Sequence, residues 1–379
     1  MRNPLFKKLP GCVVGALIAA GVAQTAMVHA VDGNPPGLFE LDGNIPDDAA
    51  KAGDDWGGLY DGSSTKANLI AFTGVLSDPA PKSIFTQGGS KDVNDIPDWK
   101  YTDGAVPDKD DITNAYAAAY TNPSDVCMTN GAPSTCTTGQ TPVHKANDLI
   151  VYFGFDRYAN NGDAFAGFWF FQSNVSLNAN GTFNGKHTAM RADPNNPGKF
   201  LPGDMFVTVA YPQASGAVPS IKVYEWDPND VNGDKNVDPD LSGGKMSPLQ
   251  LLASSANATC DGNGNKLACA ISNLSGQNSP PWPYTPKSGT GLPFESFFEG
   301  GINVTRLLGS TPCFASFLAE TRSSSSQTAQ LKDFVVGAFP VCGIDVTKAC
   351  AGDLNATGDG VNVKFFGTLT NTGGSSYVA

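Results

Sequence analysis

The feature that most constrains this chain is a pair of aromatic runs between residues 149 and 172. Residues 149–155 are apolar and rich in β-branched and aromatic side chains, and residues 165–171 contain five aromatic side chains. Asn-Asn-Gly-Asp at 160–163 separates them, and Asn and Gly accept the positive φ angles of tight turns. Neither run alternates with polar residues, which is typical of strands buried on both faces or in a sandwich core. We therefore predict a β-hairpin here, at the centre of a β-sandwich.

The first 30 residues have the pattern of an export signal. Arg2, Lys7 and Lys8 form a basic start, residues 13–28 are largely apolar, and Val28 and Ala30 offer a cleavage site. No later stretch is apolar over the ~18 residues that a membrane span requires. We expect a secreted or cell-surface protein with no membrane span after cleavage.

The charge of the mature chain argues against nucleic acid or an anionic membrane as partner. Removing residues 1–30 takes away three of the 24 basic residues and none of the 36 acidic ones, which leaves a formal charge of −15. Such a chain repels polyanions and suits a soluble exported protein or one that binds cations. Its 43 glycines, 27 prolines and 16% charged residues favour turns and strands over long helices.

Seven cysteines remain after the signal, and their spacing predicts three local disulfides. Export permits disulfides, and each local pair would close a loop. The expected pairs are Cys127–Cys136, Cys260–Cys269 and Cys313–Cys342, with Cys350 left over. A zinc site is not indicated, because no Cys-x-x-Cys spacing occurs.

Short apolar runs between turn clusters predict an all-β fold, namely an antiparallel β-sandwich of jelly-roll type with long loops and one short helix. The helix is expected at 110–120, where two aspartates precede a run of good helix formers. Residues 314–321 and 331–339 are expected to form a closing hairpin, and residues 294–308 a strand or short helix. The head domain is predicted to span residues 31–342.

Residues 343–379 differ from the head domain because they contain two alternating strands and then stop. They look like the start of a second, Ig-like or prealbumin-like β domain, and two strands cannot form an independent domain. Either the domain continues in a longer chain, or these strands pair with the sandwich or with another copy. The last alternative predicts self-association through residues 343–379.

Several motifs resemble known exported proteins. Phe-Glu-Leu-Asp-Gly-Asn-Ile-Pro-Asp-Asp at 39–48 and Tyr-Phe-Gly-Phe-Asp at 152–156 resemble the DOMON-like superfamily, which includes family 9 carbohydrate-binding modules. The segments at 88–99, 107–112, 152–157 and 167–172 together resemble a group of bacterial exported proteins of unknown activity, in which such a head precedes Ig-like or prealbumin-like surface repeats. The resemblance implies a β-sandwich, calcium and glycan binding.

Calcium is the ligand that the residue pattern favours first. It takes six to eight oxygen ligands, which loops supply from alternating Asp, Asn and backbone carbonyls. One candidate loop places such side chains at every second position: Asp230, Asn232, Asp234, Asn236 and Asp238. The loop differs from an EF-hand in having Lys235 at the usual glycine and no closing Glu. The alternative is a solvated acidic insertion.

A second candidate calcium site is a group of aspartates near the central aromatic runs. If the acidic loop folds back, its carboxylates repel one another unless a cation intervenes. The group comprises Asp92, Asp95, Asp108, Asp110, Asp111, Asp156 and Asp163. In the alternative, Asp110 and Asp111 cap the predicted helix while Lys91, Lys109 and Arg157 pair with the others.

Loop aromatic residues and glutamates are candidates for glycan contact or hydrolysis. Trp99, Trp282 and Tyr284 could stack on sugar rings, although loop tryptophans also cover the rims of cores. Hydrolases of glycans use two carboxyl groups across a cleft. The candidates are Glu225, Glu295, Glu299 and Glu320, with no strand motif typical of such enzymes, and the mature histidines are His144 and His187 in polar loops.

These observations predict a non-catalytic, calcium-assisted β-sandwich at the cell surface or in the extracellular matrix. Binding or adhesion, with a glycan as the expected ligand class, is the first hypothesis. The alternatives are a structural subunit completed by strand pairing between copies, and a hydrolase acting on polysaccharides.

Overall fold

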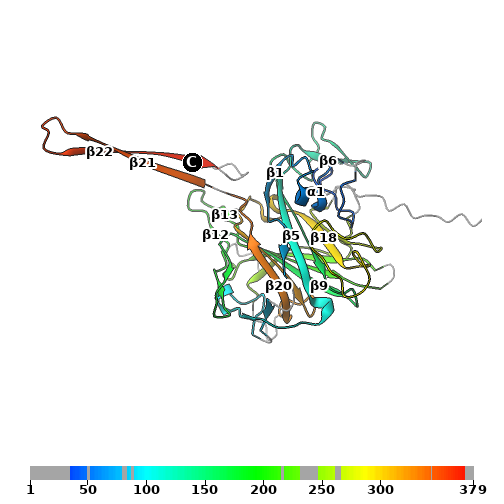
Figure 1. Ribbon diagram of the computed structural model, residues 1–379. Coiled ribbons are helices and arrows are strands. Elements are labelled where there is room, and N and C mark those ends of the chain that lie inside the picture. Colours follow the sequence, from blue (N-terminus) through cyan, green and yellow to red (C-terminus); the bar gives the residue numbers. More distant parts are fainter. Residues whose placement is uncertain are drawn as a thin grey trace, which may run out of the picture.

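The computed structural model describes residues 35–48, 52–78, 83–86, 89–214, 217–230, 246–260, 266–342 and 344–371. Two antiparallel sheets pack face to face as a sandwich (Figure 1), which confirms the predicted fold class. The described residues contain two short α-helices, α1 (Trp56–Asp61) and α2 (Val304–Leu308). They also contain two 3-10 turns, η1 (Ile96–Asp98) and η2 (Asp108–Asp110).

The first sheet has six strands. Its order is β1 (Leu69–Phe72), β5 (Ile112–Thr121), β8 (Leu149–Arg157), β18 (Phe297–Asn303) and β17 (Ala268–Ser272), with β2 (Leu76–Ser77) also on β5. Glycines in β18 let the neighbouring strand approach, because a Cβ on Gly300 would lie 2.8 Å from the Phe153 ring. The two central strands, β8 and β18, are buried along their whole length.

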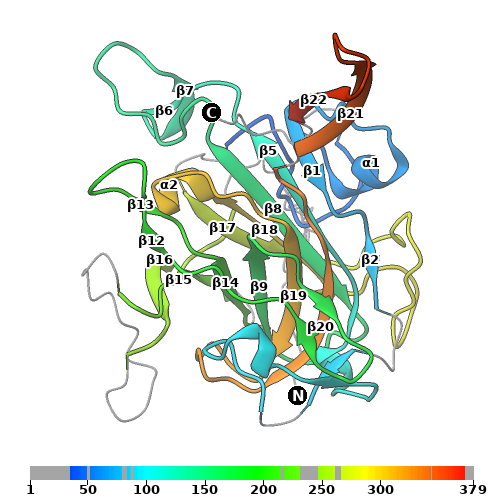
Figure 2. The same cartoon turned by 90° about the vertical axis from the view of Figure 1, so that its left-hand side faces the viewer.

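The second sheet has eight strands. Its order is β16 (Leu249–Ser255), β15 (Ser220–Trp226), β14 (Met205–Tyr211), β9 (Ala164–Phe171), β19 (Ser316–Arg322), β20 (Leu331–Ala338), β3 (Ile84–Phe85) and β4 (Tyr101–Thr102). The predicted closing hairpin is confirmed as β19 and β20, which pair antiparallel. Figure 2 shows strands of both layers.

The aromatic runs at 149–172 do not form the predicted hairpin. Their strands β8 and β9 lie in different sheets, so the Asn-Asn-Gly-Asp segment passes from one layer to the other. That segment bonds outside the two strands, since Gln213 N donates to Asp163 Oδ1 at 2.8 Å and Gly162 N to Gln213 Oε1 at 2.6 Å. A turn signal does not specify whether its flanking strands pair, and strands buried this fully each need neighbours on both edges. Their place at the centre of the sandwich is confirmed.

The helix predicted at 110–120 is also wrong, because these residues form strand β5. Ala and Tyr alternate between the two faces of the sheet, as in a strand. Ala115, Ala117 and Ala119 pack into the core between the sheets. Tyr116 and Tyr120 pack on the outer face. Strand pairing with β8 along nine residue pairs overrides the helix preference of alanine. The aspartates before it form η2 instead of the first turn of a helix.

Loops bury the outer faces of both sheets, so the molecule has three apolar layers. Besides the core between the sheets, residues near 38–59 and 282–297 cover the six-stranded sheet. Residues near 93–99 and 175–187 cover the eight-stranded sheet. The short strand pair β10 (Ser176–Leu177) with β11 (Phe183–Asn184) lies in such a covering segment. A second short pair follows it in the chain, β12 (Arg191–Ala192) with β13 (Phe200–Leu201).

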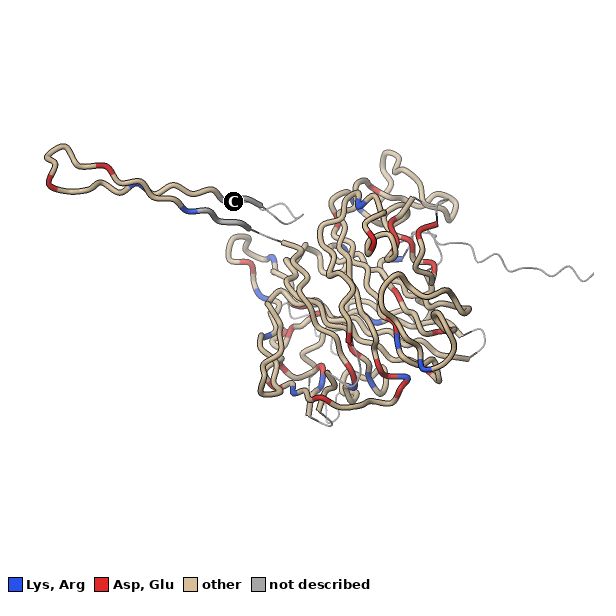
Figure 3. The backbone as a smooth tube through the Cα atoms, viewed as in Figure 1, with Lys and Arg blue, Asp and Glu red and all other residues tan. Residues whose placement is uncertain are grey.

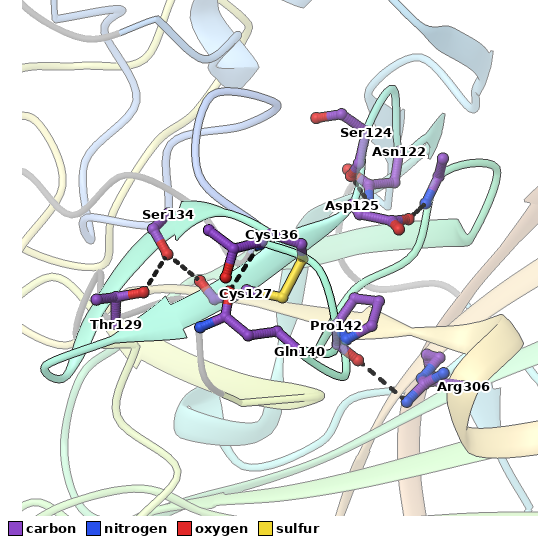
Figure 4. The surroundings of a disulfide bond; sticks show 12 residues. Asn122, Ser124, Asp125, Cys127, Thr129, Ser134, Cys136, Gln140, Pro142 and Arg306 are labelled. Carbon is purple, nitrogen blue, oxygen red and sulfur yellow. Dashed lines mark hydrogen bonds between the residues drawn. A yellow bond between two sulfur atoms is a disulfide. The ribbon is translucent and has the colours of Figure 1, made fainter.

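All three predicted disulfides are confirmed, Cys127–Cys136, Cys260–Cys269 and Cys313–Cys342, and Cys350 is free and exposed. Figure 4 shows the first of them beside the hairpin of β6 (Val126–Thr129) and β7 (Ala132–Thr135). Three disulfides indicate an oxidising, extracytoplasmic compartment. Among the described residues, no helix is both long and apolar enough to cross a membrane.

The predicted pair of strands after residue 343 is confirmed as a hairpin of β21 (Ile344–Leu354) and β22 (Val361–Asn371). The two strands pair along all eleven residues of each. In Figure 1 the hairpin extends away from the sandwich.

Candidate ligand cleft and buried carboxyl groups

A large cleft lies beside residues 35–48, which we call the N-terminal segment. It has a volume of about 1030 Å³ and is bordered by residues 42–47, by one side of α1 and by the loop at 271–281. Its polar lining is rich in carboxylate, amide and hydroxyl groups: Asp42, Asn44, Asp47, Asp61, Ser63, Ser275, Gln277, Asn278 and Ser279. Apolar side chains such as Ile45, Ile271 and Pro281 line the remainder.

The N-terminal segment is fixed to the sandwich by backbone bonds and by Phe39. Glu40 N donates to Asp54 O at 2.8 Å, and the Phe39 ring stacks on Tyr152 of β8 with centroids 4.6 Å apart. Gly43 has a φ of +78°, and a Cβ there would lie 2.6 Å from Ser272 O, so only glycine fits this turn. The segment is therefore a rigid wall of the cleft.

Two fully buried carboxyl groups lie behind this wall. Glu299 of β18 accepts from Gly43 N at 2.7 Å and from Trp56 Nε1 at 2.9 Å. Asp55 caps α1 by accepting from Trp56 N at 2.5 Å, and its other oxygen has no described partner. Burial, then the charges of Glu299 and Asp42, raise the pKa of Asp55 well above its ordinary value. The pKa of Glu299 is raised in the same way, by burial and then by Asp42.

Two further carboxyl groups of the N-terminal segment join this pair. Burial raises the pKa of Glu40 to about 7, although Asp48 N donates to it at 3.0 Å. Burial also raises the pKa of Asp42, while bonds from Asn44 oppose the shift. We call Glu40, Asp42, Asp55 and Glu299 the N-terminal acid cluster. Burial first and like charges second raise all four pKa values, so the cluster disfavours the charged forms of its members.

A different group of charges lies on the outer face of the eight-stranded sheet. Asp92 accepts from Trp169 Nε1 at 3.0 Å and pairs with Arg322 at 2.8 Å, with all three side chains buried. Burial, then Asp92, raise the pKa of Glu320, and Arg322 opposes the shift. We call Asp92, Glu320 and Arg322 the Arg322 cluster.

The structure separates the aspartates that were predicted to form the second calcium site. Asp92 belongs to the Arg322 cluster, and Asp95 caps η1 and accepts from His187 N at 3.0 Å. Asp156 lies on the other sheet, where it accepts from Asn114 Nδ2 and Trp282 Nε1, both at 2.9 Å. No group of three or more Asp, Glu, His or Cys side chains among the described residues is placed to hold a metal ion. The structure does not bring these aspartates together in one place, and calcium binding by them stays a prediction.

The aspartates around η2 also have separate surroundings. Asp108 forms an exposed ion pair with Lys287, and Lys109 Nζ donates to the backbone oxygen of Asp163 at 3.2 Å. Asp111 borders a smaller cleft of about 300 Å³, where burial and then Asp108 raise its pKa to about 6. Burial raises the pKa of Asp156 to about 7.

The first predicted calcium loop lies mostly outside the described residues. Only Asp230 is described, with a φ of +44°. Asn232, Asp234, Asn236 and Asp238 fall outside. Calcium binding by this loop stays a prediction.

The predicted glycan-stacking tryptophans are buried. Trp99 is 0% exposed and Trp282 is 3% exposed, and each indole nitrogen donates within the protein, to Lys91 O and to Asp156 respectively. Tyr284 is partly buried, and its hydroxyl donates to Arg157 O at 2.9 Å. Neither tryptophan has an open ring face, so both cover the core, as in the alternative reading.

The candidate glutamates and histidines are buried as well. Glu299 and Glu320 are 0% exposed, while Glu225 and Glu295 are 3% and 6% exposed. His187 lies against Trp226, with centroids 4.0 Å apart, and contacts Asp204 at 3.3 Å. Sequence reasoning placed both histidines in polar loops and missed the acid cluster altogether. The available signal was a carboxylate between apolar strand residues, as in Phe-Glu-Leu-Asp and Phe-Phe-Glu-Gly.

Comparisons of the chain with models of protein families, with curated proteins and with solved structures found no match.

Proposed function

We propose that this chain is an exported surface or matrix protein that binds a hydroxyl-rich ligand, such as a glycan, without transforming it. The observation that supports this function is the cleft of about 1030 Å³ beside the N-terminal segment. Its volume is at the upper end of the roughly 300–1,000 Å³ that is usual for ligand sites. The disulfides agree with a location outside the cytoplasm.

The cleft offers hydrogen-bonding groups suited to hydroxyls. Carboxylates accept hydrogen bonds only, whereas the amides of Gln277 and Asn278 both donate and accept. A sugar hydroxyl can match either kind of partner, and the apolar side chains of Ile271 and Pro281 suit its C–H face. Recognition would depend on hydrogen bonds, because the tryptophans that could stack on a sugar are buried.

The position of the two carboxyl groups with raised pKa values, Asp55 and Glu299, agrees with a protein that binds a glycan without hydrolysing it. Asp55 and Glu299 are fully buried behind the wall of the cleft, where they hold Gly43 and Trp56. A glycoside hydrolase instead needs its two carboxyl groups on either side of the scissile bond. Asp230, the described residue of the predicted calcium loop, does not line this cleft.

A glycan array tests this function with a blocked variant. Ser279→Trp places a large side chain in the cleft from an exposed loop position, and Thr138→Trp is a matched control at an exposed position in another loop. We expect wild type and Thr138→Trp to retain the same glycans and Ser279→Trp to lose at least about tenfold in affinity, or ~1.4 kcal/mol. Binding that survives in Ser279→Trp contradicts this site, and release of shortened glycans contradicts a non-catalytic function.

A further inference from the structure

The hairpin of β21 and β22 has two unlike faces. Side chains alternate along each strand, and the register pairs Cys350 with Phe365. One face, which we call the Cys350 face, therefore carries Lys348, Cys350, Gly352, Leu354, Val361, Val363, Phe365 and Gly367. The opposite face, the Lys364 face, carries Ala349, Ala351, Asp353, Asn362, Lys364, Phe366 and Thr368. The first is mainly apolar and the second is mixed and more polar.

The large apolar side chains of the Cys350 face are exposed. Leu354, Val361, Val363 and Phe365 are 71%, 63%, 53% and 67% exposed. Lys348 lies over the Phe365 ring at 4.9 Å and brings the one charge of this face among its described side chains. Figure 3 shows few charged residues along the hairpin. A two-stranded sheet is marginally stable in water, and a one-sided apolar pattern indicates a face that becomes covered.

We propose that the Cys350 face docks on the same face of a second copy of this chain. The two-fold axis lies between the two docked faces, at the level of the Cys350–Phe365 pair of each copy, and runs perpendicular to the strands. The two hairpins therefore lie antiparallel. Val363 of one copy then lies over Gly367 of the other, and Lys348 over Gly352. Large side chains thus meet small ones on both sides of the axis, as a self-complementary two-fold interface requires. The antiparallel arrangement also leaves the two sandwiches at opposite ends.

The size of the face sets the strength that we expect. A strand of eleven residues is about 37 Å long at ~3.4 Å per residue, and a two-stranded face is about 10 Å wide. Two such faces bury on the order of 700–800 Å², below the roughly 1,200 Å² of a standard stable interface. Association should therefore be weak and dependent on concentration.

Cys350 reports on this interface because it lies at the proposed axis. It is the free cysteine of the described residues, and the proposed docking places it opposite Cys350 of the second copy. A disulfide between two facing sheets is known geometry, since Ig domains contain one. Oxidised glutathione can supply it: two Cys350 thiols and one oxidised glutathione give one Cys350–Cys350 disulfide and two reduced glutathiones.

The test compares two neighbouring phenylalanines of β22 on opposite faces. The full chain is made with Cys12→Ser, so that Cys350 is the thiol outside the three disulfides, and is oxidised with glutathione over a range of concentrations. Sedimentation velocity and non-reducing electrophoresis then measure the dimer. We expect Phe365→Ser to lower the yield of crosslinked dimer about tenfold or more, because the substitution removes a large apolar side chain from the centre of the proposed interface. Phe366→Ser, exposed to 57% on the Lys364 face, should leave the yield unchanged.

Three results would overturn the interface. The chain could remain monomeric and uncrosslinked at every concentration, which excludes docking. Equal crosslinking in both variants would indicate random thiol collisions, and equal loss in both would indicate pairing through a strand edge instead of a face. Thermal melting of the sandwich, followed in parallel, separates these results from a general folding defect.

Discussion

The two outer faces of the sandwich bury carboxyl groups in different ways. On the eight-stranded sheet, Asp92 and Glu320 lie beside Arg322, whose guanidinium also lies over the Phe206 ring at 5.3 Å. On the six-stranded sheet, the charges that act on Asp55 are those of other carboxylates. The Arg322 cluster therefore contains an internal cation, whereas the N-terminal acid cluster consists of carboxyl groups whose pKa values are raised by burial and by one another. The contribution of the Arg322 cluster to stability should therefore depend on keeping the Arg322 side chain. The contribution of the N-terminal acid cluster should depend on pH.

The largest effect should follow from removing the internal cation. Arg322→Met leaves Asp92 buried without its partner, and breaking a buried pair in this way costs about 3–5 kcal/mol. Urea denaturation measures the loss, with the exposed Arg191→Met as control. A loss below ~1 kcal/mol would mean that Arg322 does not neutralise the cluster.

The second effect is a fall in stability as the pH rises. The folded-state pKa values of Glu40 and Asp156 are raised to about 7 and that of Asp111 to about 6, from ordinary values near 4. The folded chain therefore binds more protons than the unfolded chain between these values, and unfolding releases them. Each unit of pKa shift corresponds to about 1.4 kcal/mol, and the fully buried Asp156 should carry most of the effect because solvent screens less of its charge. The free energy of unfolding should therefore fall by roughly 2–3 kcal/mol from pH 5 to pH 8.

Urea denaturation at pH 5, 6.5 and 8 measures this fall. A profile that is flat, or that rises with pH, would show that the buried carboxyl groups gain a cation or water on folding. Arg322→Met measured at the same three pH values sharpens the comparison, because its destabilisation should be present at each of them.

Sequence reasoning found the features that depend on local patterns. Nine-residue spacing predicted two disulfides, and the runs around 314–339 predicted the closing hairpin. It failed where distant contacts decide. Alanine favours helix, yet β5 is a strand because Ala117 packs between the sheets. Gly43 and Glu299 are 256 residues apart, and nothing in either segment marks the other as its partner.

The third effect should come from removing one carboxylate of the N-terminal acid cluster. Asp55→Asn keeps the cap of α1, since Asn caps helices as well as Asp does, and removes a like charge beside Glu299. We expect Asp55→Asn to be more stable than wild type at pH 8, because burial and the neighbouring carboxylates disfavour the charged form of Asp55, and to differ little from wild type at pH 5. The exposed Asp61→Asn should leave the pH profile unchanged.

An equal loss of stability at both pH values in Asp55→Asn would contradict this account. It would mean that the carboxylate is held as an anion by a cation, in which case the N-terminal acid cluster would resemble the Arg322 cluster and the comparison would fail.

The smallest expected effect is that of calcium on stability. It tests whether a divalent cation can neutralise the buried carboxyl groups in place of protons. The described residues contain no group of three or more acidic, His or Cys side chains placed to hold a metal. We therefore expect any calcium response to come from the loop at 230–240. Ten times Kd of calcium would stabilise the fold by about 1.4 kcal/mol. Thermal melting with calcium and then with chelator measures it.

Two variants assign the calcium response to one region. Asp234→Asn should abolish the shift, and Asp55→Asn should preserve it, because Asp55 belongs to no group among the described residues that is placed to hold a metal. The reverse result would place calcium at Asp55 and Glu299. Their raised pKa values would then reflect the absence of a cation that the two carboxylates bind. The fall in stability between pH 5 and pH 8 should in that case disappear when calcium is present, because calcium would neutralise the carboxylates as they lose their protons.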